Sequence, residues 1–372
     1  MGRVLVIVMA AAAPLGGSGR PATSERFCGL PLLERAQALV GRAVAGATVV
    51  TSDRAEGLVE LIAAHAGEAA AHEVVLAIDP RVPLITEGTL ARLVAAASAG
   101  RAVAVGRSFA QPAALAIPTD RLDAAGEAVL LDAPDREVAP VTDKTALVEL
   151  ERAAYLLRSQ ELLAAGLLVR DPATTRIAGP ITFGVDVEIR PGCTLEGPIT
   201  LGDRVLIGDH CVVTRASIGD DTAVRPFTII EDATVGAGGF VGPYARVRPG
   251  TEVGDRAQIG NFVELKAARL GEHARINHLS FVGDAALGAD VTIGAGTITC
   301  NHDGVGVQRT EIGAGAYVGS GCILVAPITI GEGATVGAGS TLTEDAPAQR
   351  LTLARARQAV VEGWKGFRSG RT

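Results

Sequence analysis

A six-residue repeat constrains the fold of this chain more than any other feature of its sequence. Beyond residue 180 an aliphatic residue recurs about every six positions and is usually followed by glycine, as in Ile207-Gly208, Val241-Gly242, Ile293-Gly294 and Val336-Gly337. A period sustained this long predicts a parallel β-helix. Three six-residue rungs form one triangular coil, in which the aliphatic side chain points inward and the glycine lets the corner turn. The aromatic content of 3% agrees with a narrow interior, whereas a β-sandwich would need strands of period two.

The β-helix geometry also predicts which residues stack. Successive coils lie about 4.8 Å apart, so residues about 18 apart in the sequence form a column on one face. The segment from Cys300 to Arg309, CNHDGVGVQR, breaks the repeat. It cannot be accommodated as regular rungs and is therefore expected to leave the prism as a loop. Loops on a rigid scaffold are where binding and chemistry concentrate.

The first 140 residues follow a different rhythm, in which short β-branched runs such as VLVIV, VVLAI and AVAVG alternate with longer alanine- and leucine-rich segments such as PLLERAQALVGRA. This pattern is typical of βαβ units and predicts an α/β domain with a mostly parallel sheet. Residues 142–165 predict one long helix, with Thr142 or Asp143 as N-cap and Gly166 at its end. The expected organisation is an α/β domain (1–140), a linker helix (141–166), a β-helix (167–345) and a tail (346–372).

Composition narrows the function. The formal charge of −7 and a pI near 5.5 leave no basic surface for nucleic acid. No apolar run reaches the roughly 18 residues of a membrane-spanning helix. Five cysteines without CxxC spacing suggest neither a disulfide framework nor a zinc ribbon, which favours the cytoplasm. The opening MGRVLVIVMAAAAPLGG imitates a signal peptide, but the cysteine usage favours the alternative, a buried first strand.

Polar residues that break the repeat cluster within four or five coils: Arg246, Arg248, Asn261, Glu264, Lys266, His278, Asn301, His302, Asp303 and Ser320. Arg248 and Lys266 are 18 apart, so one column can carry two cations, which suit a phosphate dianion. Two solvated surface charges are the alternative. His278 and Glu264 suggest a general base and the group that orients it, because imidazole titrates near neutral pH. A structural or merely exposed histidine is the alternative there.

Several long sequence segments in the C-terminal half resemble those of a known family. RVRPGTEVGDRAQIGNFVELKAARLG, HLSFVGDAALGADVTIGAGTITCNHDG, LVAP and EGW resemble the acetyltransferase half of the bacterial bifunctional N-acetylglucosamine-1-phosphate uridyltransferase/glucosamine-1-phosphate acetyltransferases. The resemblance extends from about residue 165 to 365. It implies a left-handed parallel β-helix and a homotrimer with active sites at subunit boundaries. It also implies acetyl-CoA as cosubstrate, an amino-sugar phosphate as acceptor and a place in UDP-N-acetylglucosamine biosynthesis.

The resemblance also implies roles for particular residues. His278 matches the family's general base, which deprotonates the sugar amine, with Glu264 and Asn301 beside it. Ser320 matches the residue that supports the oxyanion, and such preorganised donors contribute several kcal/mol to acyl transfer. Arg248 and Lys266 match the residues that hold the sugar phosphate. Ala295, Ala338 and Arg355 match contacts to coenzyme A, and His302 and Ser320 are also expected to bind it.

Four positions depart from the family's pattern on the side of the sugar or in the loop. Phe281 stands where the family usually has tyrosine, Thr292 where it has asparagine, His302 where it has tyrosine and Val307 where it has lysine. The base, the oxyanion serine and the coenzyme A matches Ala295, Ala338 and Arg355 are kept. The resemblance therefore implies acetyl transfer more strongly than it implies the identity of the acceptor.

The N-terminal half is more degenerate. VLVIVMAAA and GLPLLERA are similar to a nucleotidyltransferase opening, but APLGGSGRPATSERF replaces the family's glycine-rich nucleotide loop. AIDPRVPLIT resembles the family's metal-binding word, with Arg81 in place of the magnesium-binding aspartate. Asp79 could substitute only if the backbone shifts. A guanidinium would repel a divalent ion, so Mg²⁺ binding and uridyl transfer are expected to be lost.

Two other classes of function remain open at this stage. A zinc enzyme similar to the β-helix carbonic anhydrases would use His273 and His278, with His302 standing in for a missing third ligand. A catalytically inactive scaffold or regulatory paralogue is the other alternative, because one half already lacks its expected motifs.

Overall fold

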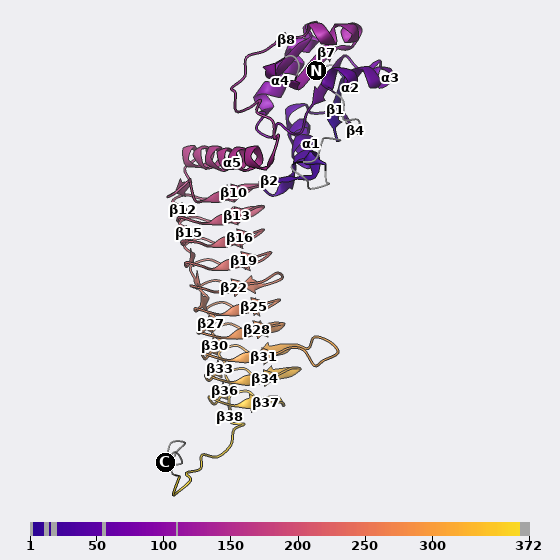
Figure 1. Ribbon diagram of the computed structural model, residues 1–372. Helices are drawn as coiled ribbons and strands as arrows, with labels where there is room; N and C mark the ends of the chain where they lie inside the picture. Colours follow the sequence, from indigo (N-terminus) through magenta and orange to yellow (C-terminus); the bar gives the residue numbers. More distant parts are fainter. Residues whose placement is uncertain (1–2, 11–14, 16–20, 54–56, 109–110, 365–372) are drawn as a thin grey trace, which may run out of the picture. The chain divides into compact units, whose positions relative to one another are not determined.

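The computed structural model describes residues 3–10, 15, 21–53, 57–108 and 111–364. The chain divides into two compact units, Met1–Arg158 and Ser159–Thr372 (Figure 1). Residues 16–20 of the glycine-rich segment, like residues 11–14 of the signal-like opening, lie outside the described residues. Within the described part of the chain, no helix is both long and apolar enough to span a membrane.

The first unit is built on a six-stranded sheet in the order β4-β1-β5-β7-β6-β8. The strands are β1 (Val4–Met9), β4 (Thr48–Ser52), β5 (Val74–Ile78), β6 (Val103–Ser108), β7 (Gln111–Pro118) and β8 (Val129–Leu130). β1 runs parallel to β4 and β5, and β6 runs parallel to β8. β7 pairs antiparallel with β5 and β6. The predicted α/β class is confirmed; β7, a run of alanines between two prolines, was not predicted.

Apolar helix faces cover both sides of this sheet. α1 (Leu32–Ala43) and α4 (Glu87–Ser98) pack on one side, and α2 (Leu58–Ala64) packs on the other. The shorter elements are η1 (Ala22–Ser24), β2 (Arg26–Phe27), β3 (Leu30–Pro31), α3 (Ala66–Ala69) and η2 (Thr119–Glu127). β1 and β5 are buried along their whole length, as expected for strands covered on both faces.

The helix predicted over residues 142–165 is observed as α5 (Lys144–Ala164). The carboxylate of Asp143 accepts a hydrogen bond from the amide of Ala146 at 2.8 Å, so Asp143 is the N-cap. Gly166 follows the helix with a φ of +102°. This left-handed conformation is common where a helix ends and glycine adopts it without steric cost.

The second unit is a parallel β-helix with three faces, each a ladder of short strands. Face 1 consists of β9 (Leu168–Val169), β12 (Glu188–Ile189), β15 (Leu206–Ile207), β18 (Ala223–Val224), β21 (Phe240–Val241), β24 (Gln258–Ile259), β27 (Arg275–Ile276), β30 (Thr292–Ile293), β33 (Tyr317–Val318), β36 (Thr335–Val336) and β38 (Leu351–Thr352). Face 2 consists of β10 (Arg176–Ala178), β13 (Thr194–Glu196), β16 (Val212–Thr214), β19 (Ile229–Glu231), β22 (Arg246–Val247), β25 (Glu264–Lys266), β28 (Phe281–Gly283), β31 (Ile298–Cys300), β34 (Ile323–Val325) and β37 (Thr341–Leu342). Face 3 consists of β11 (Ile181–Phe183), β14 (Ile199–Leu201), β17 (Ser217–Ile218), β20 (Thr234–Val235), β23 (Glu252–Val253), β26 (Arg269–Leu270), β29 (Ala285–Leu287), β32 (Thr310–Ile312) and β35 (Ile328–Ile330).

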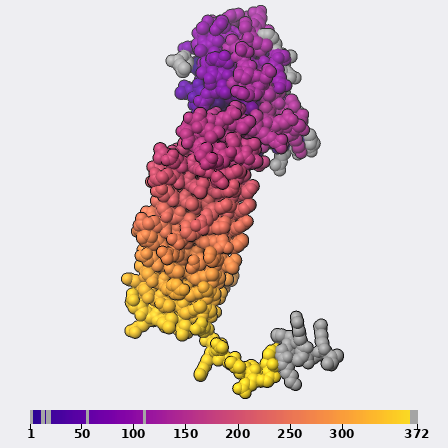
Figure 2. Space-filling model, turned by 90° about the vertical axis from the view of Figure 1, so that its left-hand side faces the viewer, coloured from indigo at the N-terminus to yellow at the C-terminus, as the bar shows by residue number. Residues whose placement is uncertain are grey.

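Aliphatic side chains fill the prism, as the repeat predicts. On face 2, for example, Val247, Leu265, Val282 and Leu324 are all at most 1% exposed. The predicted fold class of an α/β domain followed by a β-helix of hexapeptide repeats is therefore confirmed. Strand pairing continues to β38, beyond residue 345, and the described chain then leaves the prism as an extended segment (Figure 2).

The break in the repeat is also observed as a loop. Residues 301–309 join β31 on face 2 to β32 on face 3 and project from the corner between these faces (Figure 1). The strands on either side of the loop keep their pairing, because β31 pairs with β34 on face 2 and β32 pairs with β29 on face 3. The stacking of coils therefore continues on either side of the loop. The loop therefore presents its residues on an otherwise regular scaffold.

Candidate functional site

Four of the predicted residues stack along the corner between faces 1 and 2. We call the residues His278, Ala295, Ser320 and Ala338 the corner column. Each lies three positions after a residue of one continuous strand ladder, in which β27 pairs with β30, β30 with β33 and β33 with β36. The main-chain carbonyls of the first three each accept a hydrogen bond from the next coil, at 2.8–2.9 Å. The four residues therefore occupy equivalent positions in consecutive coils.

The imidazole of His278 begins this column and lies exposed. A Cβ atom placed on Gly260, one coil earlier, would lie 3.1 Å from its Nδ1 atom, so the glycine leaves room for the ring. At the other end, Nη1 of Arg355 donates a hydrogen bond to the main-chain carbonyl of Ala338 at 2.7 Å. This contact places a guanidinium at the end of the corner column.

Arg248 and Lys266 lie side by side on face 2. β22 pairs with β25 with Arg246 opposite Glu264, so Arg248 stands opposite Lys266 on the next coil. Each cation has a carboxylate partner: Nη1 of Arg248 lies 2.9 Å from Oε1 of Glu264, and Nζ of Lys266 lies 3.3 Å from Oδ2 of Asp284. The four side chains are only partly exposed, which strengthens these pairs relative to pairs in open water.

Glu264 and His278 are not joined within one chain. The carboxylate of Glu264 accepts a hydrogen bond from Arg248, and the imidazole of His278 makes no side-chain hydrogen bond to any other residue that the structure describes. The two residues stand on different parts of the coil, since Glu264 starts a face 2 strand and His278 lies in a corner. A direct base and orienter pair is therefore not formed in this structure.

Hydrogen bonds to the prism and within the loop hold the loop residues in place. Nδ2 of Asn301 lies 2.5 Å from Oδ2 of Asp284, and His302 forms an isolated antiparallel bridge with Val307. The carboxylate of Asp303 accepts hydrogen bonds from the amides of Val305 and Gly306 at 2.9 and 2.7 Å. These amides lower the pKa of Asp303 to about 2. The loop is thus a closed turn whose tip residue, Val305, is 96% exposed.

Phe281 and Thr292, two of the departures from the family pattern, lie on different faces. Phe281 lies on face 2 directly after Glu264 in the ladder. A Cβ placed on Gly283 would lie 2.6 Å from the Cζ atom of Phe281 and 2.9 Å from Nδ2 of Asn301, so the end of the ring lies close to the loop. Thr292 lies on face 1, between Arg275 and Tyr317.

Sequence reasoning missed Asp284, which contacts both Lys266 and Asn301. It follows Lys266 by 18 positions, but that spacing recurs along the whole repeat and does not single the residue out. Only the observed path of the loop, which returns beside Asp284, shows its place in the site.

In the first unit, Arg81 neutralises Asp79. Its guanidinium lies 3.0 Å from Oδ1 and 2.7 Å from Oδ2 of Asp79, and its main-chain amide donates to Oδ1 at 2.9 Å. The hydrogen bonds to Asp79 raise the pKa of Arg81. Both oxygens of this buried carboxylate are therefore engaged by one cation. Over the described parts of the chain, no cluster of three or more His, Cys, Asp or Glu could hold a metal ion.

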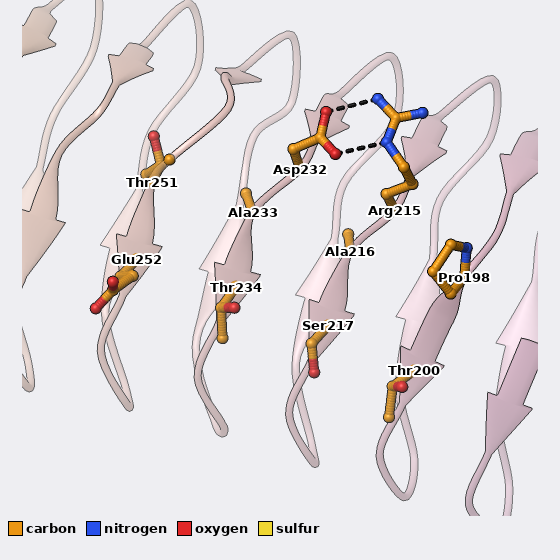
Figure 3. A pocket seen from close by; sticks show the side chains of 11 residues that line it. Pro198, Thr200, Arg215, Ala216, Ser217, Asp232, Ala233, Thr234, Thr251 and Glu252 are labelled. Carbon is orange, nitrogen blue, oxygen red and sulfur yellow. Dashed lines mark hydrogen bonds and ion pairs between the residues drawn. The ribbon is translucent and has the colours of Figure 1, made fainter.

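The histidines of the zinc alternative are separated. His273 lies at the corner between faces 3 and 1, where it contacts Arg256 and Asp290, whereas His278 lies at the corner between faces 1 and 2. A shallow pocket elsewhere runs along face 3 and its corner with face 2 (Figure 3). It is lined by residues between Pro198 and Glu252, and it includes none of the predicted site residues.

The repeat, the three-faced prism and the corner column define the class of protein: a β-helix of hexapeptide repeats. A family model described as bacterial transferase hexapeptide (six repeats) matches residues 309–344, which agrees with that assignment.

The curated relatives are named Bifunctional protein GlmU. The protein from Chromobacterium violaceum is 48% identical over 229 residues, which is 62% of this chain and 50% of the relative. The protein from Ralstonia nicotianae is 50% identical over 229 residues, with the same shares. The chain thus spans about half the length of the curated relatives it matches. The predicted resemblance is confirmed over that part.

Similarity to solved structures is lower. LpxA from Acinetobacter baumannii is 16% identical, with a TM-score of 0.38 over 50% of this chain and 71% of that one.

Proposed function

We propose that this protein is an acetyl-CoA-dependent N-acetyltransferase whose acceptor is an amino-sugar phosphate, with glucosamine-1-phosphate as the preferred candidate. The observation that carries the proposal is the corner column. It places two small residues, a serine and an imidazole that has no side-chain partner among the described residues along one edge, with the guanidinium of Arg355 at its end. The relatives named Bifunctional protein GlmU support the same class of chemistry.

In the proposed reaction, the amine of the sugar attacks the thioester carbonyl of acetyl-CoA. His278 accepts a proton from the amine as the C–N bond forms. The C–S bond then breaks, and the coenzyme A thiolate takes a proton from the imidazolium or from water and leaves as the thiol. Ser320 donates a hydrogen bond to the carbonyl oxygen while it carries negative charge. The small side chains of Ala295 and Ala338 leave space for the pantetheine arm, and Arg355 offers positive charge to the phosphates of coenzyme A.

The spacing of the column suits this reaction. His278 and Ser320 are two coils apart, which is about 10 Å between their main chains. Two hydrogen bonds of about 2.8 Å and the two covalent bonds between the amine and the carbonyl oxygen span about 8 Å. The side chains of His278 and Ser320 can therefore contact the amine and the carbonyl oxygen at the same time.

The acceptor site is proposed on face 2. Arg248 and Lys266 are neighbouring cations on adjacent coils, which matches the charge and size of a phosphate dianion. Each is already paired with a carboxylate, but an ammonium carries three donors and a guanidinium five. Both cations can therefore bind phosphate oxygens while they keep their partners.

A homotrimer with shared active sites is proposed from the surface next to His278. Phe227, Tyr244 and Phe262 stack in consecutive coils at centroid distances of 4.9 and 5.1 Å, and Leu279 continues the same corner position. These side chains are 45–65% exposed. An apolar column of this kind beside the candidate base favours a neighbouring copy at this corner. Cytoplasmic localisation is proposed with it, since acetyl-CoA is used there.

Loss of uridyl transfer is part of the proposal. The oxygens of Asp79 accept three side-chain hydrogen bonds from Arg81, and a divalent ion would have to compete with this bidentate pair. Mg²⁺ is therefore not expected to bind at the position where the resemblance implies it.

The experiment measures release of coenzyme A thiol from acetyl-CoA by the full chain in the presence of glucosamine-1-phosphate. His278→Ala is expected to lower turnover about 100- to 10,000-fold, the usual range for a general base, without loss of folding because the side chain is exposed. His273→Ala is the matched control, a nearby histidine at another corner, and should keep near-normal turnover. No thiol release by the unaltered protein would favour an inactive scaffold, and near-normal turnover of His278→Ala would return that residue to a structural role.

A further inference from the structure

Asp284 joins two parts of the acceptor site. It lies at the corner between faces 2 and 3, directly after β28, and its side chain is 20% exposed. Its Oδ2 atom lies 3.3 Å from Nζ of Lys266 and 2.5 Å from Nδ2 of Asn301. One carboxylate oxygen thus contacts a lysine of the prism and the first residue of the loop.

The main chain of Asp284 reinforces this link. Its amide donates to the carbonyl of Lys266 at 2.8 Å, and its carbonyl accepts from the amide of Thr310 at 3.2 Å. Thr310 is the first residue after the loop. The loop therefore leaves the prism next to the carboxylate of Asp284 and returns to its carbonyl, so both ends of residues 301–309 are fastened to this one residue.

We propose that Asp284 is a positioning residue that holds the ammonium of Lys266 and the loop in one arrangement and thereby sets the affinity for the acceptor's phosphate. The inference rests on the proposed function of face 2 as the phosphate site. A lysine side chain has four rotatable bonds, so an unpaired ammonium would sample many positions. The ion pair restricts these positions in advance, and such preorganisation lowers the cost of binding.

A carboxylate near a phosphate site could also act against binding by repelling the dianion. The contacts favour the positioning role, because Lys266 can donate to Asp284 and to a phosphate at the same time. Asn301 would lose its side-chain acceptor if Asp284 were removed, and the start of the loop would then be free to move. The two roles predict opposite changes in the KM for the acceptor, so they can be separated by measurement.

The chain offers a matched control three coils earlier. Asp232 occupies the same corner position with nearly the same backbone, a φ of +44° against +50° for Asp284. It is paired with Arg215 through two hydrogen bonds of 2.5 and 2.6 Å (Figure 3). No loop is inserted in the following coil, and among the described residues no predicted site residue makes a hydrogen bond or ion pair with Asp232. Asp232→Ala therefore removes an equivalent ion pair at an equivalent corner without touching the acceptor site.

The kinetic test compares Asp284→Ala, Asp284→Asn and Asp232→Ala in the full chain. Asp284→Ala is expected to raise the KM for glucosamine-1-phosphate about tenfold or more, the effect of one lost charge-assisted hydrogen bond. Asp284→Asn keeps an acceptor for Asn301 and should show a smaller increase. Asp232→Ala should leave this KM unchanged. A KM that is unchanged or lower in Asp284→Ala would overturn the positioning role.

A second readout does not depend on turnover. Hydrogen exchange of residues 301–309 is expected to become at least about tenfold faster in Asp284→Ala and to stay unchanged in Asp232→Ala, because fewer fastening contacts make local opening easier. Equal protection of the loop in the unaltered protein, Asp284→Ala and Asp232→Ala would overturn the inference. If the unaltered protein releases no thiol, the proposed function fails, whereas the exchange result still decides whether Asp284 holds the loop.

Discussion

The identity of the acceptor can be tested by restoring two polar groups, Phe281→Tyr and Val307→Lys. The family resemblance implies a tyrosine and a lysine at these positions, where this chain carries apolar side chains. We expect the natural protein to acetylate glucosamine-1-phosphate, because Arg248 and Lys266 remain. The KM should be high, because the two polar groups are missing. The double variant is expected to bind the same acceptor more tightly.

The structure indicates where the new groups would lie. The Cζ atom of Phe281, to which the hydroxyl would be added, reaches over Gly283, which pairs with Lys266 in the ladder. The hydroxyl would therefore enter the space beside Lys266 and Asn301. Val307 is 52% exposed and bridged to His302, so a lysine there can extend into solvent without loss of packing.

The expected magnitude follows from these contacts. A hydrogen bond to a charged group contributes about 1.5–3 kcal/mol. One new contact of this strength lowers the KM at least about tenfold, and a second one lowers it further. Because the phosphate takes no part in the bond changes of acyl transfer, both contacts should be made equally in the ground state and the transition state. The kcat should then change little, the signature of uniform binding.

The assay is thiol release at varied glucosamine-1-phosphate and saturating acetyl-CoA. Val305→Lys, at the exposed tip of the same loop, adds the same charge away from the site and controls for general electrostatic attraction. A double variant with an unchanged KM would refute the reasoning, as would a natural protein that already binds glucosamine-1-phosphate tightly. In either case the substitutions would be neutral.

Three further predictions follow from other parts of the chain. With UTP, N-acetylglucosamine-1-phosphate and Mg²⁺, the Arg81–Asp79 pair should leave the protein without pyrophosphate release; a rate of about 1 per second or faster would contradict this. Sedimentation at micromolar concentration should show a trimer, and an active monomer would refute shared sites. The lowered pKa of Asp303 means that its ionised form is favoured in the closed loop. Exchange protection of the loop should therefore persist from pH 7 to about 4 and be lost as the pH falls towards 2, whereas Asp303→Asn should show no such step.

Much of the fold could be predicted because each rung of a β-helix repeats the same local requirement. The aliphatic residue must point inward and the next residue must allow a turn, so the period alone indicates the architecture and the place where it breaks. β7 was missed because its sequence, QPAALAIP, has only one β-branched residue, Ile117, and lacks the period of a strand. Its pairing with β5 and β6 is set by the rest of the sheet.

The candidate site could be predicted only where stacking decides it. Arg248 and Lys266 share a column because their spacing equals one coil. The corner column is less regular: His278 and Ala295 are 17 apart, whereas Ala295 and Ser320 are 25 apart because the loop lies between them. Asp284 and Asn301 also occupy equivalent positions in consecutive coils, but the return of the chain from the loop to the carbonyl of Asp284 through Thr310 depends on the path of that loop. No period in the sequence encodes that path.

The placement of these residues separates two properties of the proposed enzyme. The corner column, which would carry the acyl chemistry, lies between faces 1 and 2, whereas Phe281, Val307 and Asp284 lie on face 2 or at its corner with face 3. Each face is an independent hydrogen-bonded ladder, so a side chain can change on one without moving the other. Thr292 is the exception, because it lies on face 1 three positions before Ala295. Substitutions at Phe281 or Val307 should therefore alter the choice of acceptor at little cost in kcat, whereas substitution of Thr292 is expected to affect both properties.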